Sequence, residues 1–387
     1  MHIGSKSVSS LHRIALLLIF LVLSVVTAAA SPPGGEIVYM EGEVDILRDG
    51  TRVPSHRVDV GFIIEEFDMV ETGSGGYVEF VLTSSYGGGA SVTVNPNTSF
   101  YFEGVEGKKR KETEFSTMAG SMAYKVKKLS GNEAFRVRTE SAVMGVRGTD
   151  FDVTISPEGS VLVACEEGRV AVTDEKEGAS YYSEPGQVVE KLTEQGVQSR
   201  RVSASELESF RESWIESREE VFKRGAPTFI KSYGRRYLQY LPKFEEVYKE
   251  LETHRSKLKR FEGEGVPGSL GDVFRTKSDA SPAVVKMRSI LPVFEHVFFR
   301  LQTLERYHSQ GIGKGMIDSK TSSERFFRSF RNESSKVKEM LSETYYLLRL
   351  YQKAHEASGG GPSILDDPFG GEDGFGGGSM PKPMFDR

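Results

Sequence analysis

The sequence predicts a multidomain chain in which an all-β domain is followed by an α-helical domain. Two observations carry this prediction. Residues 36–192 are rich in Val, Ile, Thr, Tyr and Phe and contain runs in which apolar residues alternate with period two, and from about residue 203 apolar residues recur with the period of a helix. The chain has 387 residues, 38% of them hydrophobic, so it is long and apolar enough to form more than one core.

The N-terminal segment has the pattern of an export signal. Basic residues such as Lys6 and Arg13 precede an apolar run over residues 14–26, and a run of small residues ends at Ala30. That order is typical of a secretory signal peptide. We expect residues 1–30 to be removed after Ala30 and the mature protein to be exported to the periplasm or cell envelope. The alternative is a retained membrane anchor, because the run counted through Ala30 is a marginal span.

The all-β domain is expected over residues 36–192. Period-two alternation is clear in residues 77–83, 91–102 and 151–156, and turn residues such as Asp49-Gly50 separate the runs. Many short strands at this spacing are typical of an all-β domain.

A weak internal repeat refines the expected β-architecture. Residues 40–50 and 166–176 both contain Glu-Gly-x-Val followed by an apolar position. Repeated coils of similar shape favour a short β-solenoid or rolled β-structure over a sandwich.

The helical domain is expected over residues 203–357. Its first helix should begin with a capping box formed by Ser205 and Glu208, and it should end at Gly225 because Ala226-Pro227 breaks the chain. Three further amphipathic runs predict a helical bundle or a pair of helical hairpins: residues 228–261, interrupted by Pro242, residues 281–310 and residues 322–357.

The last segment, residues 358–387, is dominated by Gly and Pro and carries isolated Phe residues and acidic pairs. Such a composition cannot bury enough apolar surface to fold alone, so we expect a disordered tail.

The residues give no sign of catalytic chemistry. The formal net charge is −5, which is unlike a nucleic-acid binder. No two histidines stand four residues apart in a helix, as a zinc site of that kind needs, and no G-x-S-x-G elbow occurs. Cys165 is the single cysteine and is interpreted as a buried small hydrophobe. Glu295-His296 is interpreted as an ordinary surface or groove position. We predict no enzyme activity, cofactor or metal.

The densest motif spans residues 138–153, RTESAVMGVRGTDFDV. Gly145 and Gly148 can adopt backbone angles closed to other residues, so they predict a tight structural corner braced by Arg147. A phosphate cradle would need a helix after the glycines, and a strand is expected instead. The residues assigned structural roles here are Arg138, Thr139, Gly145, Arg147, Gly148, Thr149 and Phe151.

These residues carry a resemblance to the FecR domain family. The family signature, R-T-P-x-A-V-x-G-V-R-G-T-x-F-x-V, is matched from Arg138 to Val153, except that Glu140 stands where the family usually has Pro. Residues 167–170 resemble the family's E-G-x-V turn and residues 185–187 its P-G-Q element. Residues 68–72 resemble its G-D-x-V-x-T element, with Phe67 in place of Gly. The resemblance covers roughly residues 36–192.

The resemblance implies an extracytoplasmic β-rich module that takes part in signal transfer across bacterial envelopes. The best-known members are transmembrane regulators of sigma factors in iron uptake and carry a cytoplasmic anti-sigma domain before the membrane span. Only thirteen residues precede the apolar run here, so we expect no such domain. Direct sigma-factor control and an iron-related role are not carried over.

Taken together, the sequence predicts an exported, non-enzymatic envelope protein that acts in protein–protein interaction or envelope signalling. Its helical half would dock on another protein or form a dimer. One alternative is a membrane-anchored regulator of the FecR type. Another is a glycan-binding envelope module, in which exposed aromatic residues of the β-domain stack on sugars. The candidates for that stacking are Tyr86, Phe100, Tyr101, Tyr181 and Tyr182.

Overall fold

The computed structural model describes residues 34–83, 89–106, 111–129, 133–146, 148–174, 178–193, 195–262 and 268–359. The expected signal peptide, the expected tail from residue 360 onward, and Arg147 and Tyr86 lie outside the described residues. All described residues belong to one compact unit that begins at Gly34.

The described residues contain seventeen strands, and all of them lie between Gly34 and Arg201, in and just beyond the region where the sequence predicts an all-β domain. Two of the three alternating runs, residues 77–83 and 151–156, form one strand each. The third run, residues 91–102, divides into two strands at the Asn95–Asn97 turn. The strands are β1 (Gly34–Glu41), β2 (Val44–Arg48), β3 (Thr51–Arg52), β4 (Ile63–Glu65), β5 (Met69–Thr72), β6 (Tyr77–Leu82), β7 (Ser91–Val94), β8 (Ser99–Glu106), β9 (Lys111–Lys125), β10 (Glu133–Arg138), β11 (Ala142–Val146), β12 (Asp150–Ile155), β13 (Val161–Glu167), β14 (Val170–Asp174), β15 (Ser180–Ser183), β16 (Gln187–Leu192) and β17 (Gly196–Arg201).

The strands pair in two series that share the long strand β9. The first sheet has the order β4-β1-β6-β7-β9-β12-β13-β16-β17. The second sheet has the order β3-β2-β5-β8-β9-β10-β11-β14-β15. β9 passes from the second sheet to the first near Gly120, whose φ is +89°. Glycine adopts this left-handed conformation without steric cost.

The expected β-solenoid is not confirmed. Stacked solenoid coils would place equivalent strands in parallel, whereas every pairing among the described strands is antiparallel except β9 with β10. The strands instead form one open sheet, which the crossing of β9 divides into the two parts described above. The repeated Glu-Gly-x-Val element has a different meaning, because each copy carries the chain from the first sheet into the second, from β1 to β2 and from β13 to β14.

The core of the β-module lies between the two sheets and is rich in aromatic rings. Phe80 of the first sheet stacks on Phe100 of the second at 5.8 Å between ring centroids, and Phe151 stacks on Tyr124 at 5.0 Å. These side chains are almost fully buried. Truncating a buried phenylalanine to alanine typically costs about 3–5 kcal/mol, so this cluster contributes strongly to stability.

Four α-helices follow the strands: α2 (Leu207–Glu252), α3 (Arg255–Leu258), α4 (Leu270–Ser309) and α5 (Ser323–Ala357). Two short 3-10 turns, η1 (Ser55–Arg57) and η2 (Lys259–Phe261), complete the elements. α5 occupies the expected fourth run, while α4 begins eleven residues before the expected start at residue 281. No helix in these described segments combines the length and apolarity needed to cross a membrane.

Two expected features of the first helix are wrong. The capping box of Ser205 and Glu208 does not form, because α2 begins at Leu207 with Glu206 as its N-cap and without a side-chain cap bond. The helix also continues through Gly225 and Pro227 instead of ending there. A proline inside a helix costs about 3 kcal/mol. We attribute the continuation to burial of Ala226 and neighbouring apolar residues of α2 on both sides of the proline.

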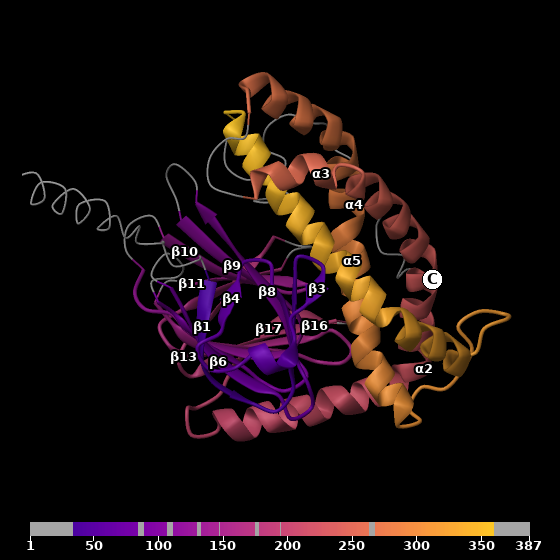
Figure 1. Ribbon diagram of the computed structural model, residues 1–387. Coiled ribbons are helices and arrows are strands. Elements are labelled where there is room, and N and C mark those ends of the chain that lie inside the picture. Colours follow the sequence, from indigo (N-terminus) through magenta and orange to yellow (C-terminus); the bar gives the residue numbers. More distant parts are fainter. Residues whose placement is uncertain are drawn as a thin grey trace, which may run out of the picture. The chain divides into compact units, whose positions relative to one another are not determined.

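The helices pack directly on the β-module. α5 contacts β2 and β3, and α4 contacts β9 (Figure 1). Leu47, Met69, Tyr101 and Met118 from the strands belong to the same apolar cluster as the long helices. The long helices pack on one another, but an independent helical bundle is not confirmed, because part of their apolar surface is buried against strands.

Candidate functional site

The signature motif begins in a tight turn between β10 and β11. Thr139, which is 2% exposed, closes the turn: its backbone N–H donates to the Ala142 carbonyl at 2.9 Å. Its hydroxyl accepts from the Ala142 N–H at 3.2 Å. The turn therefore holds Glu140 at its tip in a fixed direction.

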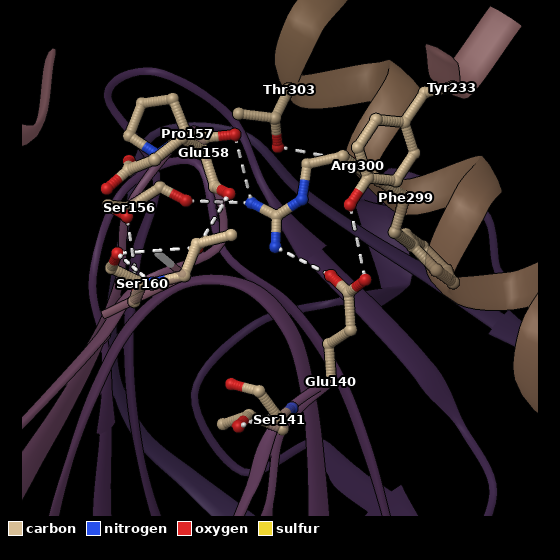
Figure 2. A network of polar contacts seen from close by, with 12 residues as sticks. Glu140, Ser141, Ser156, Pro157, Glu158, Ser160, Tyr233, Phe299, Arg300 and Thr303 are labelled. Atoms are coloured by element: carbon tan, nitrogen blue, oxygen red, sulfur yellow. Dashed lines mark hydrogen bonds and ion pairs between the residues drawn. The ribbon is translucent and has the colours of Figure 1, made fainter. Parts of the chain in front are cut away.

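Glu140 binds two helices at once (Figure 2). One carboxylate oxygen accepts from Nη2 of Arg300 on α4 at 3.0 Å, and the other accepts from the hydroxyl of Tyr233 on α2 at 3.2 Å. Burial by itself raises the pKa of Glu140, but Arg300 and His296 outweigh burial and the pKa is lowered from its usual value. The carboxylate is therefore charged at neutral pH.

Arg300 connects the signature turn to a second turn of the module. It is 3% exposed, and its Nη1 donates to the carbonyls of Ser156 at 2.7 Å and Pro157 at 3.2 Å, between β12 and β13 (Figure 2). Burial by itself lowers the pKa of Arg300, but the charge and hydrogen bond of Glu140, together with Tyr233 and Glu158, outweigh burial, and the pKa is raised. One helical arginine thus joins two turns of the β-module through charge-assisted hydrogen bonds.

A cavity of about 80 Å³ lies beside this contact, between the strands and α4 and α5. Arg138 and Thr139 of the signature line it, and Arg138 donates to Glu114 of β9 at 2.7 Å. On the helical side, the Tyr345 hydroxyl donates to Glu295, which is 5% exposed. Burial raises the pKa of Glu295 well above its usual value, so this carboxyl favours its neutral form.

The second half of the signature lies at the opposite end of β11. Gly148 has φ +75°, and a Cβ there would lie 2.8 Å from the Lys128 Cα, so the expected corner is at this residue. Gly145 is different: it lies inside β11, paired with Arg136 and Ala171, and does not have a positive φ. The expectation that both glycines shape the corner is therefore corrected to Gly148 alone, because the chain changes sheets only after β11.

The other signature residues support this corner from inside. Thr149 and Phe151 are buried, and Phe151 stacks on Tyr124. A Cβ at Gly168, in the Glu-Gly-x-Val turn, would lie 2.7 Å from the Gly148 carbonyl, so the two sheet-crossing turns pack against each other. The signature residues Arg138 and Thr139 line the cavity, whereas Thr149 and Phe151 do not. The bracing role expected of Arg147 falls outside the described residues and stays a prediction.

Phe67 is the second strand-side residue that reaches the helices. Its φ is +63°, a left-handed conformation that favours glycine. Its ring stacks on Tyr101 at 6.5 Å and on Tyr345 of α5 at 6.3 Å between centroids. We infer that this aromatic contact offsets the backbone strain, which typically costs about 1–3 kcal/mol.

The described residues suit contact between protein segments. No three His, Cys, Asp or Glu side chains of the described part gather as metal ligands would. Cys165 is buried as predicted, and burial raises the pKa of its thiol to about 11, which disfavours the reactive thiolate. Both carboxylate oxygens of Glu140 and both terminal nitrogens of Arg300 are bound to other protein groups. Nearby, Arg300 Nε, Ser141 Oγ and the Glu158 carboxylate oxygens are buried without a hydrogen-bond partner.

The fold and the site define a class of protein: a β-rich module whose signature turn is a binding surface for helices. Residues 68–171 match the family model described as FecR protein, so the chain contains a FecR domain, as its signature motif predicted. No curated protein matches the chain.

Two crystal structures of a "putative anti-sigma factor" from Parabacteroides distasonis are similar to the chain at 17% sequence identity, with TM-scores of 0.30 and 0.31. Each comparison covers 37% of this chain and 63% of the other, so the chain spans less than two thirds of that protein's length.

The two departures from the family signature are both contact residues. Glu140, in place of Pro, binds α2 and α4, and Phe67, in place of Gly, packs on α5. Sequence reasoning identified the two departures but not what they bind. It missed Arg300 and the burial of Glu295, since nothing in a helical pattern shows which charged residue faces a distant turn.

Proposed function

We propose that the protein is an exported, non-enzymatic cell-envelope protein that acts in protein–protein interaction within envelope signalling. In this proposal the FecR domain is the scaffold, and the chain's own helices are the permanent partner of its signature turn. The match to the FecR family supports the signalling role. The observation that carries the proposal is that both departures from the family signature bind this chain's helices.

The Glu140–Arg300 pair fixes how the helices sit on the signature turn. While the helices stay on the turn, Arg300 is 3% exposed and has little water to replace Glu140 as its counter-charge. Removing one partner of a buried ion pair typically costs about 3–5 kcal/mol. Because the helices occupy the signature turn, an external partner must bind another surface or displace them.

Export is tested by the N-terminus of the mature protein and by its location. The proposal expects mass spectrometry to place the mature N-terminus at Ser31. It also expects protease added to intact spheroplasts to digest the helices together with the β-module. Protection of the helices in spheroplasts would contradict it.

The interaction role is tested by cross-linking in envelope fractions followed by pull-down of the tagged full chain. The proposal expects one or more envelope proteins to be recovered in defined stoichiometry. Recovery of only the bare protein under several growth conditions would count against it.

The second candidate is a membrane-anchored regulator of the FecR type. The apolar run over residues 14–26 favours it, because the run reaches a marginal membrane span if it continues through Ala30. It predicts a protein that keeps Met1 and stays in the membrane fraction after a carbonate wash.

The glycan-binding alternative is not proposed further. Two of its aromatic residues point inward: Phe100 is 1% exposed and stacks in the module core, and Tyr101 is 9% exposed and packs on Tyr345. Tyr182 is exposed, but the guanidinium of Arg169 lies over its ring at 5.1 Å.

A further inference from the structure

The outer face of the first sheet is covered over one half by this chain. Trp214, near the start of α2, packs on an apolar patch that includes Leu162 and Ala164 of β13 and Val188 of β16. Arg211, three residues earlier, forms ion pairs with Asp152 of β12 and Glu166 of β13. The cover therefore combines an aromatic side chain with an arginine that binds carboxylates of the sheet.

The other half of this face contains the counterpart of β13. The repeated Glu-Gly-x-Val element makes β1 equivalent to β13, since Gly42 and Gly168 both have a positive φ and both turns lead from the first sheet into the second. In this alignment Val38 corresponds to Ala164. Ala164 is fully buried, whereas Val38 is 46% exposed and Tyr39 is 48% exposed.

The exposed half has a defined chemistry. Tyr39 and Tyr77 meet edge to face at 5.8 Å between ring centroids, and Val38 and Val81 are exposed on the same pair of strands. Tyr39, Glu41, Gly75, Tyr77, Glu79 and Pro96 line a shallow hollow. We call the residues Val38, Tyr39, Tyr77 and Val81, with the carboxylates Glu36, Glu41 and Glu79, the β1–β6 face.

The two chain segments that form this face carry acidic but no basic side chains. Residues 34–47 and 69–102 contain no lysine or arginine. Within the described residues, Asp45 and Glu71 of these segments have ion-pair partners, Arg52 and Lys338, whereas none of the three carboxylates of the β1–β6 face does. On β12 of the same sheet, the half-buried Asp150 pairs with Lys125 of β9.

We propose that the β1–β6 face binds an amphipathic segment of a partner protein, one that places an apolar or aromatic side chain on Tyr39 and Tyr77 and flanking lysine or arginine residues on the three carboxylates. This is the chemistry with which α2 covers the equivalent half of the sheet, and cations also bind tyrosine rings favourably.

The chain's last segment, residues 360–387, has five acidic against two basic residues, so its charge does not complement the face. The proposal names a partner class for the interaction role proposed above, and so rests on it.

The test uses two labelled synthetic helical peptides of 20 residues, identical in their Leu and Trp positions, one with Lys and the other with Glu at every charged position. Fluorescence anisotropy with the purified full-length protein should show binding of the Lys peptide only. The double variant Glu41→Lys with Glu79→Lys should weaken binding about tenfold, and Tyr39→Ser several-fold. The control Glu216→Lys, at an exposed position of α2 with no ion pair among the described residues, should leave binding unchanged.

Three outcomes would overturn the proposal. Equal binding of both peptides, or no binding, would exclude a cation-selective face. If Tyr39→Ser bound the Lys peptide as tightly as the wild type does, the peptide would be attracted by the protein's net charge alone and not by contact with the tyrosine rings. Self-association in sedimentation experiments that the double variant abolishes would make a second copy of the chain the occupant. Peptide binding does not depend on export, so its failure is distinguishable from a failure of the localisation experiments.

Discussion

At the scale of single residues, Glu140 decides whether the signature turn stays attached to the helices. We expect Glu140→Gln to keep the shape of the side chain but leave the Arg300 guanidinium, 3% exposed, without a counter-charge. Because Glu140 is itself 30% exposed and Arg300 keeps its two carbonyl acceptors, the free energy of unfolding should fall by about 1–3 kcal/mol, less than the roughly 3–5 kcal/mol of a fully buried pair. Denaturant unfolding measures this change. The exposed Glu246→Gln on α2 is the control and should stay within about 0.5 kcal/mol of the wild type; similar losses in both variants would contradict the assignment.

Replacing Glu295 by a neutral residue should stabilise the protein at high pH, whereas the same change at Glu140 should destabilise it. Burial raises its pKa, with Arg138 opposing, so the folded protein binds this proton more tightly than the unfolded chain does. Such a group stabilises the fold below its ordinary pKa and loses that contribution as pH rises through the raised value. The side chain in Glu295→Gln stays neutral at every pH. We therefore expect the melting temperature of this variant to be close to that of the wild type near pH 4 and to exceed it by a growing margin as the pH rises toward 9. A difference in melting temperature that does not change with pH would contradict this.

At the scale of elements, the corner between β11 and β12 depends on one glycine. Gly148→Val should destabilise the protein by more than the roughly 1 kcal/mol of a typical substitution. The reason is that φ is +75° and the new Cβ would lie 2.8 Å from the Lys128 Cα. Gly145→Ala is the matched control, because its Cβ would meet nothing within 4 Å and its φ is not positive. Melting of Gly148→Val at the wild-type temperature would refute the corner.

The elements also show where sequence reasoning succeeds and fails. Period-two alternation located β6 and β12, and helical periodicity located α5, because both patterns depend only on which face is buried. The stop at Gly225 was wrong because burial of the apolar residues on both sides outweighs the local cost of Pro227. The strand order of the two sheets and the partner of Glu140 could not be predicted. Each depends on residues far apart in the chain, and Arg300 follows Glu140 by 160 positions.

At the scale of the whole molecule, the two predicted domains share apolar and polar contacts. Strand residues such as Leu47 and Met69 lie in the cluster formed by the long helices, and Arg300 ties α4 to two turns of the module. Part of the apolar surface of the FecR domain is therefore buried against the helices. The chain instead uses the departures Phe67 and Glu140 to bind its own helices, and these contacts leave the β1–β6 face of the first sheet exposed.

This coupling predicts how the protein unfolds. Trp214 is the single tryptophan and lies where α2 contacts the first sheet, so its fluorescence reports contact between the two halves. We expect the fluorescence of Trp214 and the helical circular dichroism signal to change with one midpoint in denaturant, as a cooperative transition requires. Glu140→Arg places a second positive charge against Arg300 and should separate the two midpoints, because the helices then lose their hold on the signature turn. Separate midpoints in the wild type would instead mean that residues 36–192 and 203–357 fold as independent domains and that the packing between them contributes little to stability.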